Sequence, residues 1–198
     1  MEIIIAGKSY VLEKEIKNNE DLLAFINERL WAGDLILIQL IVEGSPVDGD
    51  YEDYILNQYI MGKRIEIVAK GKKEYLVDMV KSAREYLENC IPNVSLLVDE
   101  LYAGIKNETW NKVSDLLEAF EWLLTLVVEL EKDKTMSKYL NQDIGDRMKE
   151  TVNNLGEVHL DPIQLADLIQ YEVIPIFEEL QQIFEEDSWE EVIVHELN

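Results

Sequence analysis

Residues 65–80, IEIVAKGKKEYLVDMV, contain the position at which the hydrophobic period of this chain changes. Before Gly71, apolar residues occupy every second position, which is typical of a strand with one covered face. After Gly71 they recur at spacings of three and four residues, beginning with Tyr75 and Met79, which is typical of one face of a helix. The change predicts an α+β chain of two domains, a sheet domain over residues 1–71 and a helical bundle with a C-terminal tail over residues 72–198.

The first domain is expected to contain four main strands and one long helix. Apolar runs on either side of Gly7 predict a hairpin over residues 3–12. A helix should begin at an N-cap, Asn18 or Asn19, and end at Gly33. The almost continuous apolar run at residues 35–43 predicts a central strand, and a short helical piece near residues 54–60 should precede the last strand.

The passage LIVEGSPVDGD at residues 40–50, taken with the hairpin and the helix at residues 21–31, resembles the ubiquitin-like β-grasp fold. In such domains a strand that ends in a Gly turn, a short polar segment and a final strand follow the helix in this order. The resemblance implies a small mixed sheet crossed by one helix. It does not imply conjugation, because that would need a free diglycine tail, whereas residues 70–73, KGKK, continue into a helix.

The whole chain also resembles uncharacterised bacterial proteins that join a β-grasp domain to an acidic helical bundle. The late segment LADLIQYE at residues 165–172, followed by Pro175, contributes to this resemblance. That family brings no assigned activity, so the resemblance implies an architecture only.

Four main helices are predicted after residue 72, near residues 75–102, 110–130, 137–155 and 162–184, and short loops favour an antiparallel bundle. Pro92 should break or kink the first helix, and Pro175 should bend the last. The second helix has the strongest apolar stripe, so Leu117, Phe120 and Leu124 are expected to be almost fully buried. Trp31 and Trp110 are also expected to pack in the interior.

The charge balance limits the kinds of partner. Asp and Glu number 41 against 18 Lys and Arg, a net charge of -23, which argues against binding to nucleic acid or to an anionic membrane. After Lys149 the chain has 13 acidic residues and neither Lys nor Arg. A basic protein partner is one interpretation of this asymmetry, and simple solubility is the other.

Trp189 lies within the acidic segment EEDSWEE at residues 185–191. An aromatic side chain among carboxylates suits a short docking segment, so a partner-binding site is predicted at Trp189, Glu185, Glu186, Glu190 and Glu191. A frayed tail, or a tail that packs back on the bundle, is the alternative.

No catalytic, cofactor or metal site is predicted. His159 and His195 are the two histidines. Asp161 could orient the imidazole of His159, but a loop or capping role is preferred for this residue, and His195 is three residues from the end, where disorder is common. Cys90 has acidic, neutral and apolar neighbours, which indicates a structural thiol and not a reactive one. One cysteine cannot form an intramolecular disulfide, and the apolar runs are too short to span a membrane, so a cytoplasmic location is expected.

These observations favour a non-enzymatic protein–protein interaction module, an adaptor or regulatory partner of another protein. A small acidic chaperone of the secretion or flagellar type is the alternative, and an enzyme with a site near His159 is a further one. Nothing in the sequence decides whether the protein forms a homo-oligomer.

Overall fold

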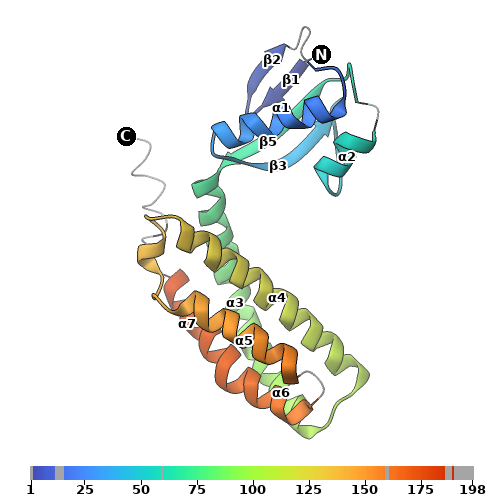
Figure 1. Ribbon diagram of the computed structural model, residues 1–198. Coiled ribbons are helices and arrows are strands. Elements are labelled where there is room, and N and C mark those ends of the chain that lie inside the picture. The colour runs from blue at the N-terminus through green and yellow to red at the C-terminus, as the bar shows by residue number, and fades with distance from the viewer. Residues whose placement is uncertain (1, 12–15, 59, 159–160, 186–188, 190–198) are drawn as a thin grey trace. The chain divides into compact units, whose positions relative to one another are not determined.

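The computed structural model describes residues 2–11, 16–58, 60–158, 161–185 and 189 (Figure 1). The chain divides into two compact units, Met1–Tyr75 and Leu76–Asn198, here termed the sheet unit and the helical unit. The division falls in the first turn of helix α3, Lys72–Ala103, which follows the last strand directly. A sheet followed by helices confirms the predicted α+β class.

The sheet unit contains a five-stranded mixed sheet in the order β2-β1-β5-β3-β4. Strands β1 and β5 pair in parallel, with Ile3 opposite Ile65, whereas every other neighbouring pair is antiparallel. In the described residues after Lys72 no strand is present. The strands are β1, Glu2–Ile5; β2, Lys8–Val11; β3, Leu35–Val42; β4, Ser45–Pro46; and β5, Ile65–Gly71.

Helix α1, Asn19–Ala32, covers one face of this sheet (Figure 1). It begins where predicted, because the Asn18 side chain accepts a hydrogen bond from the backbone N–H of Asp21 at 2.8 Å. A second helix, α2, Tyr51–Asn57, is capped in the same way by Asp50. The core between α1 and the sheet is made of aliphatic side chains that are at most 7% exposed, among them Ile3, Ile5, Leu22, Ile26, Leu30, Leu40, Ile65 and Ile67.

The β1–β2 hairpin turns through Ala6 and Gly7, both of which have positive φ, 46° and 77°. Two such residues between the paired Ile5 and Lys8 match a type I′ turn, for which Asn-Gly is the preferred sequence. The left-handed conformation is unfavourable for alanine because of its Cβ atom.

Changing Ala6 to asparagine should therefore stabilise the protein, by about 1 kcal/mol. The free energy of unfolding from urea melts measures the effect. Ala24 is a matched control, since it is exposed in the middle of α1, where asparagine should cost about 0.5 kcal/mol. A loss of stability at both positions would contradict the assignment of the turn.

The helical unit consists of antiparallel helices around one core (Figure 1). Its core includes Leu123, Val127 and Leu130 from the second helix and Phe177 and Leu180 from the last, all 0% exposed. Among the described residues, no helix combines the length and the hydropathy that crossing a membrane requires. After α3 come α4, Asn107–Lys132; a short 3-10 helix, Ser137–Tyr139; α5, Ile144–Val158; α6, Pro162–Leu168; a π-helical turn, Ile169–Val173; and α7, Ile174–Phe184.

Of the two effects expected of Pro92, a break or a kink, the break is absent, because α3 continues through the proline. One other predicted helix differs from the observed one. The third helix begins at Ile144 and not near residue 137, so Gly145 lies in its first turn. The Glu131 carboxylate lies against Gly145, so a Cβ atom there would require the flexible Glu131 side chain to move.

The prediction for the core face of α4 is correct only in part. Phe120 is buried, at 1% exposed, as expected, whereas Leu117 and Leu124 are only half-buried. Leu116 and Leu123, at 5% and 0% exposed, take their places. The stripe is apolar over more than one face, so its period alone does not select the face that the other helices cover.

The interior positions predicted for two tryptophans are wrong. Trp31 is 85% exposed at the end of α1, and Trp110 is 38% exposed in the first turns of α4. Both lie near helix ends, where fewer neighbouring elements are available to cover a large side chain.

Candidate functional site

Trp189 is buried, at 2% exposed, and belongs to the core of the helical unit. Its Nε1–H donates to the carbonyl oxygen of Ile183 at 2.8 Å. The rings of Tyr139 and Phe184 flank the indole, with centroids 5.1 and 6.0 Å away. Trp189 therefore packs back on the bundle, which is the alternative given for this tail, and partner binding by this residue stays a prediction.

The carboxylates of the predicted C-terminal site are only partly described. Glu185 follows α7 and is exposed. Glu186, Glu190 and Glu191 lie outside the described residues, as do His159 and His195. Partner binding through these glutamates stays a prediction.

A different site is present in the helical unit, a recess of about 300 Å³ between α5 and the π-helical turn. We name it the α5–π recess. Figure 1 shows α5 alongside the chain segment that includes α6 and α7. The recess is lined by Arg147, Glu150, Thr151, Asn154, Tyr171, Glu172, Pro175 and Ile176.

Pro175 explains the π-helical turn. In a regular α-helix its ring would collide with the carbonyl group four residues earlier. The turn widens instead, and the N–H of Ile174 bonds to the carbonyl of Ile169, five residues back. The bend predicted at Pro175 thus takes the form of a π-bulge, a feature frequent at functional sites.

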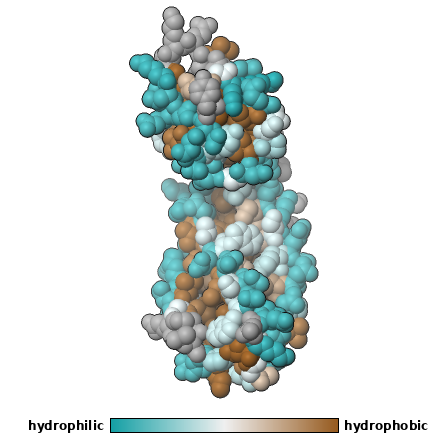
Figure 2. Space-filling model, turned by 90° about the vertical axis from the view of Figure 1, so that its right-hand side faces the viewer, coloured by the Kyte–Doolittle hydropathy of each residue, from teal (hydrophilic) through white to brown (hydrophobic). Residues whose placement is uncertain are grey.

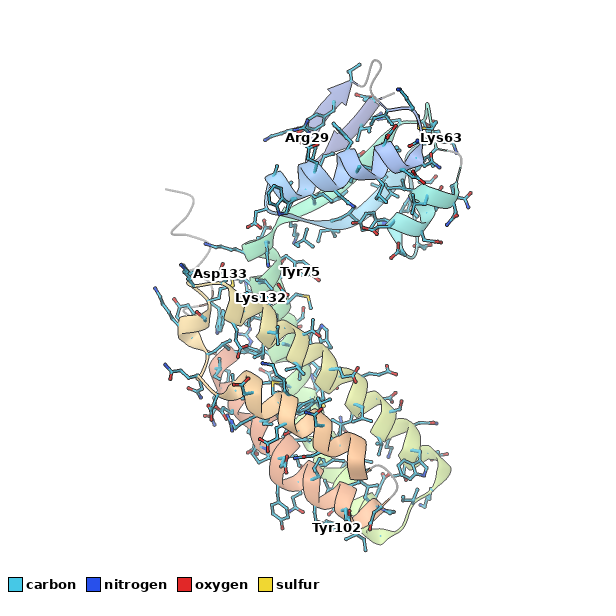
Figure 3. All side chains as sticks on the ribbon, in the orientation of Figure 1. Arg29, Lys63, Tyr75, Tyr102, Lys132 and Asp133 are labelled. Atoms are coloured by element: carbon cyan, nitrogen blue, oxygen red, sulfur yellow. The ribbon has the colours of Figure 1, made fainter. Side chains whose placement is uncertain are left out.

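The start of this segment is held by Tyr102, which lies at the end of α3 and is labelled in Figure 3. Its hydroxyl donates to the Asp167 carboxylate of α6. This hydrogen bond to a carboxylate is the main reason why the pKa of Tyr102 rises to about 12. The hydroxyl, which is protonated at neutral pH, thus joins the end of α3 to α6 through this hydrogen bond.

Glu172 forms the polar floor of the recess. Its carboxylate accepts hydrogen bonds from the Thr151 hydroxyl at 3.2 Å and the Asn154 amide at 3.3 Å. Thr151 is 2% exposed, so one of these donors is fixed inside the unit. Both donors are neutral, and among the described residues no Lys or Arg forms an ion pair with Glu172.

Among the described residues that line the wall, Arg147 is the cation, and two carboxylates lie close to it. It donates to Glu179 of α7, and its Nε atom lies 3.2 Å from Oδ2 of Asp143. Burial alone would raise the pKa of Glu179, but hydrogen bonds from Arg147 and Asn141 outweigh burial and hold it below its ordinary value. The hydrogen bond between Arg147 and Glu179 also raises the pKa of Arg147.

The recess consequently has acidic character. Glu150 is exposed at its rim, Glu172 lies within it, and Arg147 contributes little free positive charge. Tyr171, 69% exposed, adds an aromatic wall. Such a surface favours a cationic group with an apolar stem.

A second recess, of about 260 Å³, lies between α3 and α4 and includes Cys90. The Cys90 thiol donates to the Tyr86 hydroxyl at 3.2 Å, and the Tyr86 ring packs edge-on against Trp122. Burial raises the pKa of the Cys90 thiol and also that of Tyr86. The thiol is therefore protonated at neutral pH, which agrees with the structural role inferred from sequence.

Within the part of the chain that the structure describes, no group of three or more His, Cys, Asp or Glu side chains is placed to hold a metal ion. The enzyme alternative depended on His159, which is outside that part.

Sequence reasoning missed the α5–π recess, although one signal for it is present. Arg147, Thr151 and Asn154 stand at spacings of four and three residues, which places three polar side chains on one helical face. Their partner Glu172 is distant in sequence, and only the packing of α5 against the π-helical turn brings it near.

Comparison with known proteins yields one match. A family model described as a domain of unknown function (DUF8042) matches residues 78–183. The matched part runs from α3 into α7 and includes both recesses. No curated protein matches the chain, and no solved structure matches it.

Proposed function

The chain belongs to the DUF8042 family through its helical unit, and we propose that it acts as a non-enzymatic protein–protein interaction module. In this role it is an adaptor or regulatory partner of another protein. The observation that supports the proposal is the α5–π recess, where Glu150 and Glu172 meet the exposed ring of Tyr171.

Two physical effects support a protein partner with a basic surface. The chain has neither Lys nor Arg after Lys149, so its last helices attract positive charge and raise the rate of encounter. Exposed tyrosine is enriched among the residues that dominate binding energy, because it buries a large area at low entropic cost. Charge would guide the partner, and Tyr171 would hold it.

The sheet unit offers a second surface for the same role. Its strand order, with a central parallel pair β1–β5, supports the proposal that it is a ubiquitin-like β-grasp domain. Val11 and Val68, 70% and 39% exposed, occupy strand positions that alternate with the core side chains under α1. We propose that the sheet face that carries Val11 and Val68 contributes to partner binding. Figure 2 shows apolar residues among polar ones on the side of the protein that it draws.

The chaperone alternative is favoured by the recess between α3 and α4. Val94, Leu97 and Leu116 form its apolar part, and Leu96 and Trp110, 60% and 38% exposed, lie on the same two helices. An amphipathic helix of a client protein is the ligand that such a recess would take. A cytoplasmic location, proposed from the single cysteine, fits both functions.

Site-specific photocrosslinking in native lysate tests the proposal. A photoreactive aromatic amino acid in place of Tyr171 should yield a discrete adduct with one partner protein, and 0.5 M salt should reduce its yield. The matched control is the same amino acid at Glu108, an exposed position in the first turn of α4. An adduct with a second copy of the chain would indicate a homo-oligomer, and equal adducts from both positions would contradict a binding site at the recess.

A further inference from the structure

We propose that the α5–π recess binds a single arginine side chain presented by the protein partner. This inference rests on the proposed function, because it names the group that the same site recognises. The inference rests on three features of the recess. The Glu172 carboxylate has no Lys or Arg partner among the described residues, the Tyr171 ring lines one side, and the volume admits about one side chain.

Charge is the first argument. Within the part of the chain that the structure describes, the hydrogen bonds to Glu172 come from two neutral donors, Thr151 and Asn154. A carboxylate offers about four acceptor positions, so two remain for a ligand. In the described part of the chain Arg147 does not bond to Glu172: its Nη2 atom donates to Glu179, and its Nε atom lies near Asp143 without a hydrogen bond. A cation that enters the recess therefore meets net negative charge from Glu172 and Glu150.

Shape distinguishes arginine from lysine. A guanidinium is planar, donates up to five hydrogen bonds and stacks on aromatic rings, whereas an ammonium is a compact charge that is strongly hydrated. The recess provides the second oxygen of the Glu172 carboxylate, Oε1, as a charged acceptor, because Thr151 and Asn154 both donate to Oε2, and it provides the Tyr171 ring for stacking. Pro175 and Ile176 supply apolar contact for the aliphatic stem of the ligand side chain.

Size limits the ligand to one side chain. The recess measures about 300 Å³, at the lower end of the range for ligand sites. It can hold an arginine side chain but not a folded segment, so the rest of the partner must lie on the surrounding surface.

Titration of the isotope-labelled full chain with short peptides, followed by amide NMR shifts, tests this inference. The probe is acetyl-Ala-Ala-Arg-Ala-Ala-amide, and the comparison probes are the same peptide with citrulline or lysine, and spermidine. The arginine peptide should shift the amides of Thr151, Asn154 and Tyr171 saturably. The citrulline peptide should not, and the lysine peptide should bind several-fold more weakly.

Three variants make the test specific. Glu172→Gln keeps the size of the side chain and an acceptor for Thr151, and it should weaken binding of the arginine peptide about tenfold. Tyr171→Ala should weaken it several-fold, and the exposure of Tyr171 makes an effect on folding small. Glu178→Gln is the matched control, because Glu178 is exposed on α7 outside the recess and carries the same charge.

Equal weakening by Glu178→Gln and Glu172→Gln would overturn the inference, because it would show attraction to the acidic surface in general. So would equal binding of the citrulline peptide, or tighter binding of spermidine at the same amides. If these titrations fail while crosslinking at Tyr171 still captures a partner, only the arginine inference falls. If the titrations succeed and crosslinking fails, the chemistry of the recess stands and the proposed function falls.

Discussion

Replacing Trp189 with alanine should lower the free energy of unfolding by about 3–5 kcal/mol, the usual cost of truncating a buried aromatic side chain. The indole is 2% exposed, packs against Tyr139 and Phe184, and donates a hydrogen bond to Ile183. Truncation removes these contacts and leaves the Ile183 carbonyl without that donor. Residue 189 would thus contribute to stability and not to partner affinity.

Urea unfolding monitored by circular dichroism measures the loss. Trp31→Ala is the matched control, because that indole is 85% exposed and its removal should change the stability by less than about 0.5 kcal/mol. A loss below about 1 kcal/mol for Trp189→Ala, together with faster dissociation of a partner, would restore the docking role predicted from sequence.

Replacing Phe120 with alanine should also cost about 3–5 kcal/mol. Phe120 is 1% exposed in α4, and its ring stacks on Phe177 of α7 with centroids 5.7 Å apart and planes at 26°. The substitution would remove the apolar contacts of the ring and open a cavity at the centre of the core. The effect should appear as a lower urea midpoint with an unchanged slope.

Leu117→Ala is the comparison for this experiment. Leu117 lies on the same helix but is only half-buried, so its truncation should cost clearly less than that of Phe120. Equal losses at the two positions would show that the core face of α4 includes Leu117, as the apolar spacing predicts. A negligible loss at Phe120 would instead assign that face to an interface.

Much of the sheet unit could be predicted from the sequence because its signals are local. Each of three signals involves only residues that are close together in the sequence: the Asn18 cap, the glycine turns and the alternation of apolar residues in β5. Each signal has the structural effect expected of it. The same holds for Asp161, which caps α6 by accepting from the N–H groups of Ile163 and Gln164.

The acidic recess could not be predicted in the same way. Thr151 and Asn154 are ordinary polar helix positions until Glu172, from another helix, comes within hydrogen-bonding distance. Which carboxylates remain without a cationic partner is likewise a matter of packing, because Arg147 pairs with Glu179 across two helices.

The sequence by itself determined the α+β order, the change of period at Gly71, the helix caps and the excess of negative charge, since these depend on composition and on neighbours along the chain. Only the tertiary structure decided that Leu116 and not Leu117 faces the core, that Trp189 is buried, and that the π-helical turn brings Glu172 to α5. These outcomes depend on contacts between elements distant in sequence. A broad apolar stripe or an aromatic residue among carboxylates is compatible with either placement until those elements pack.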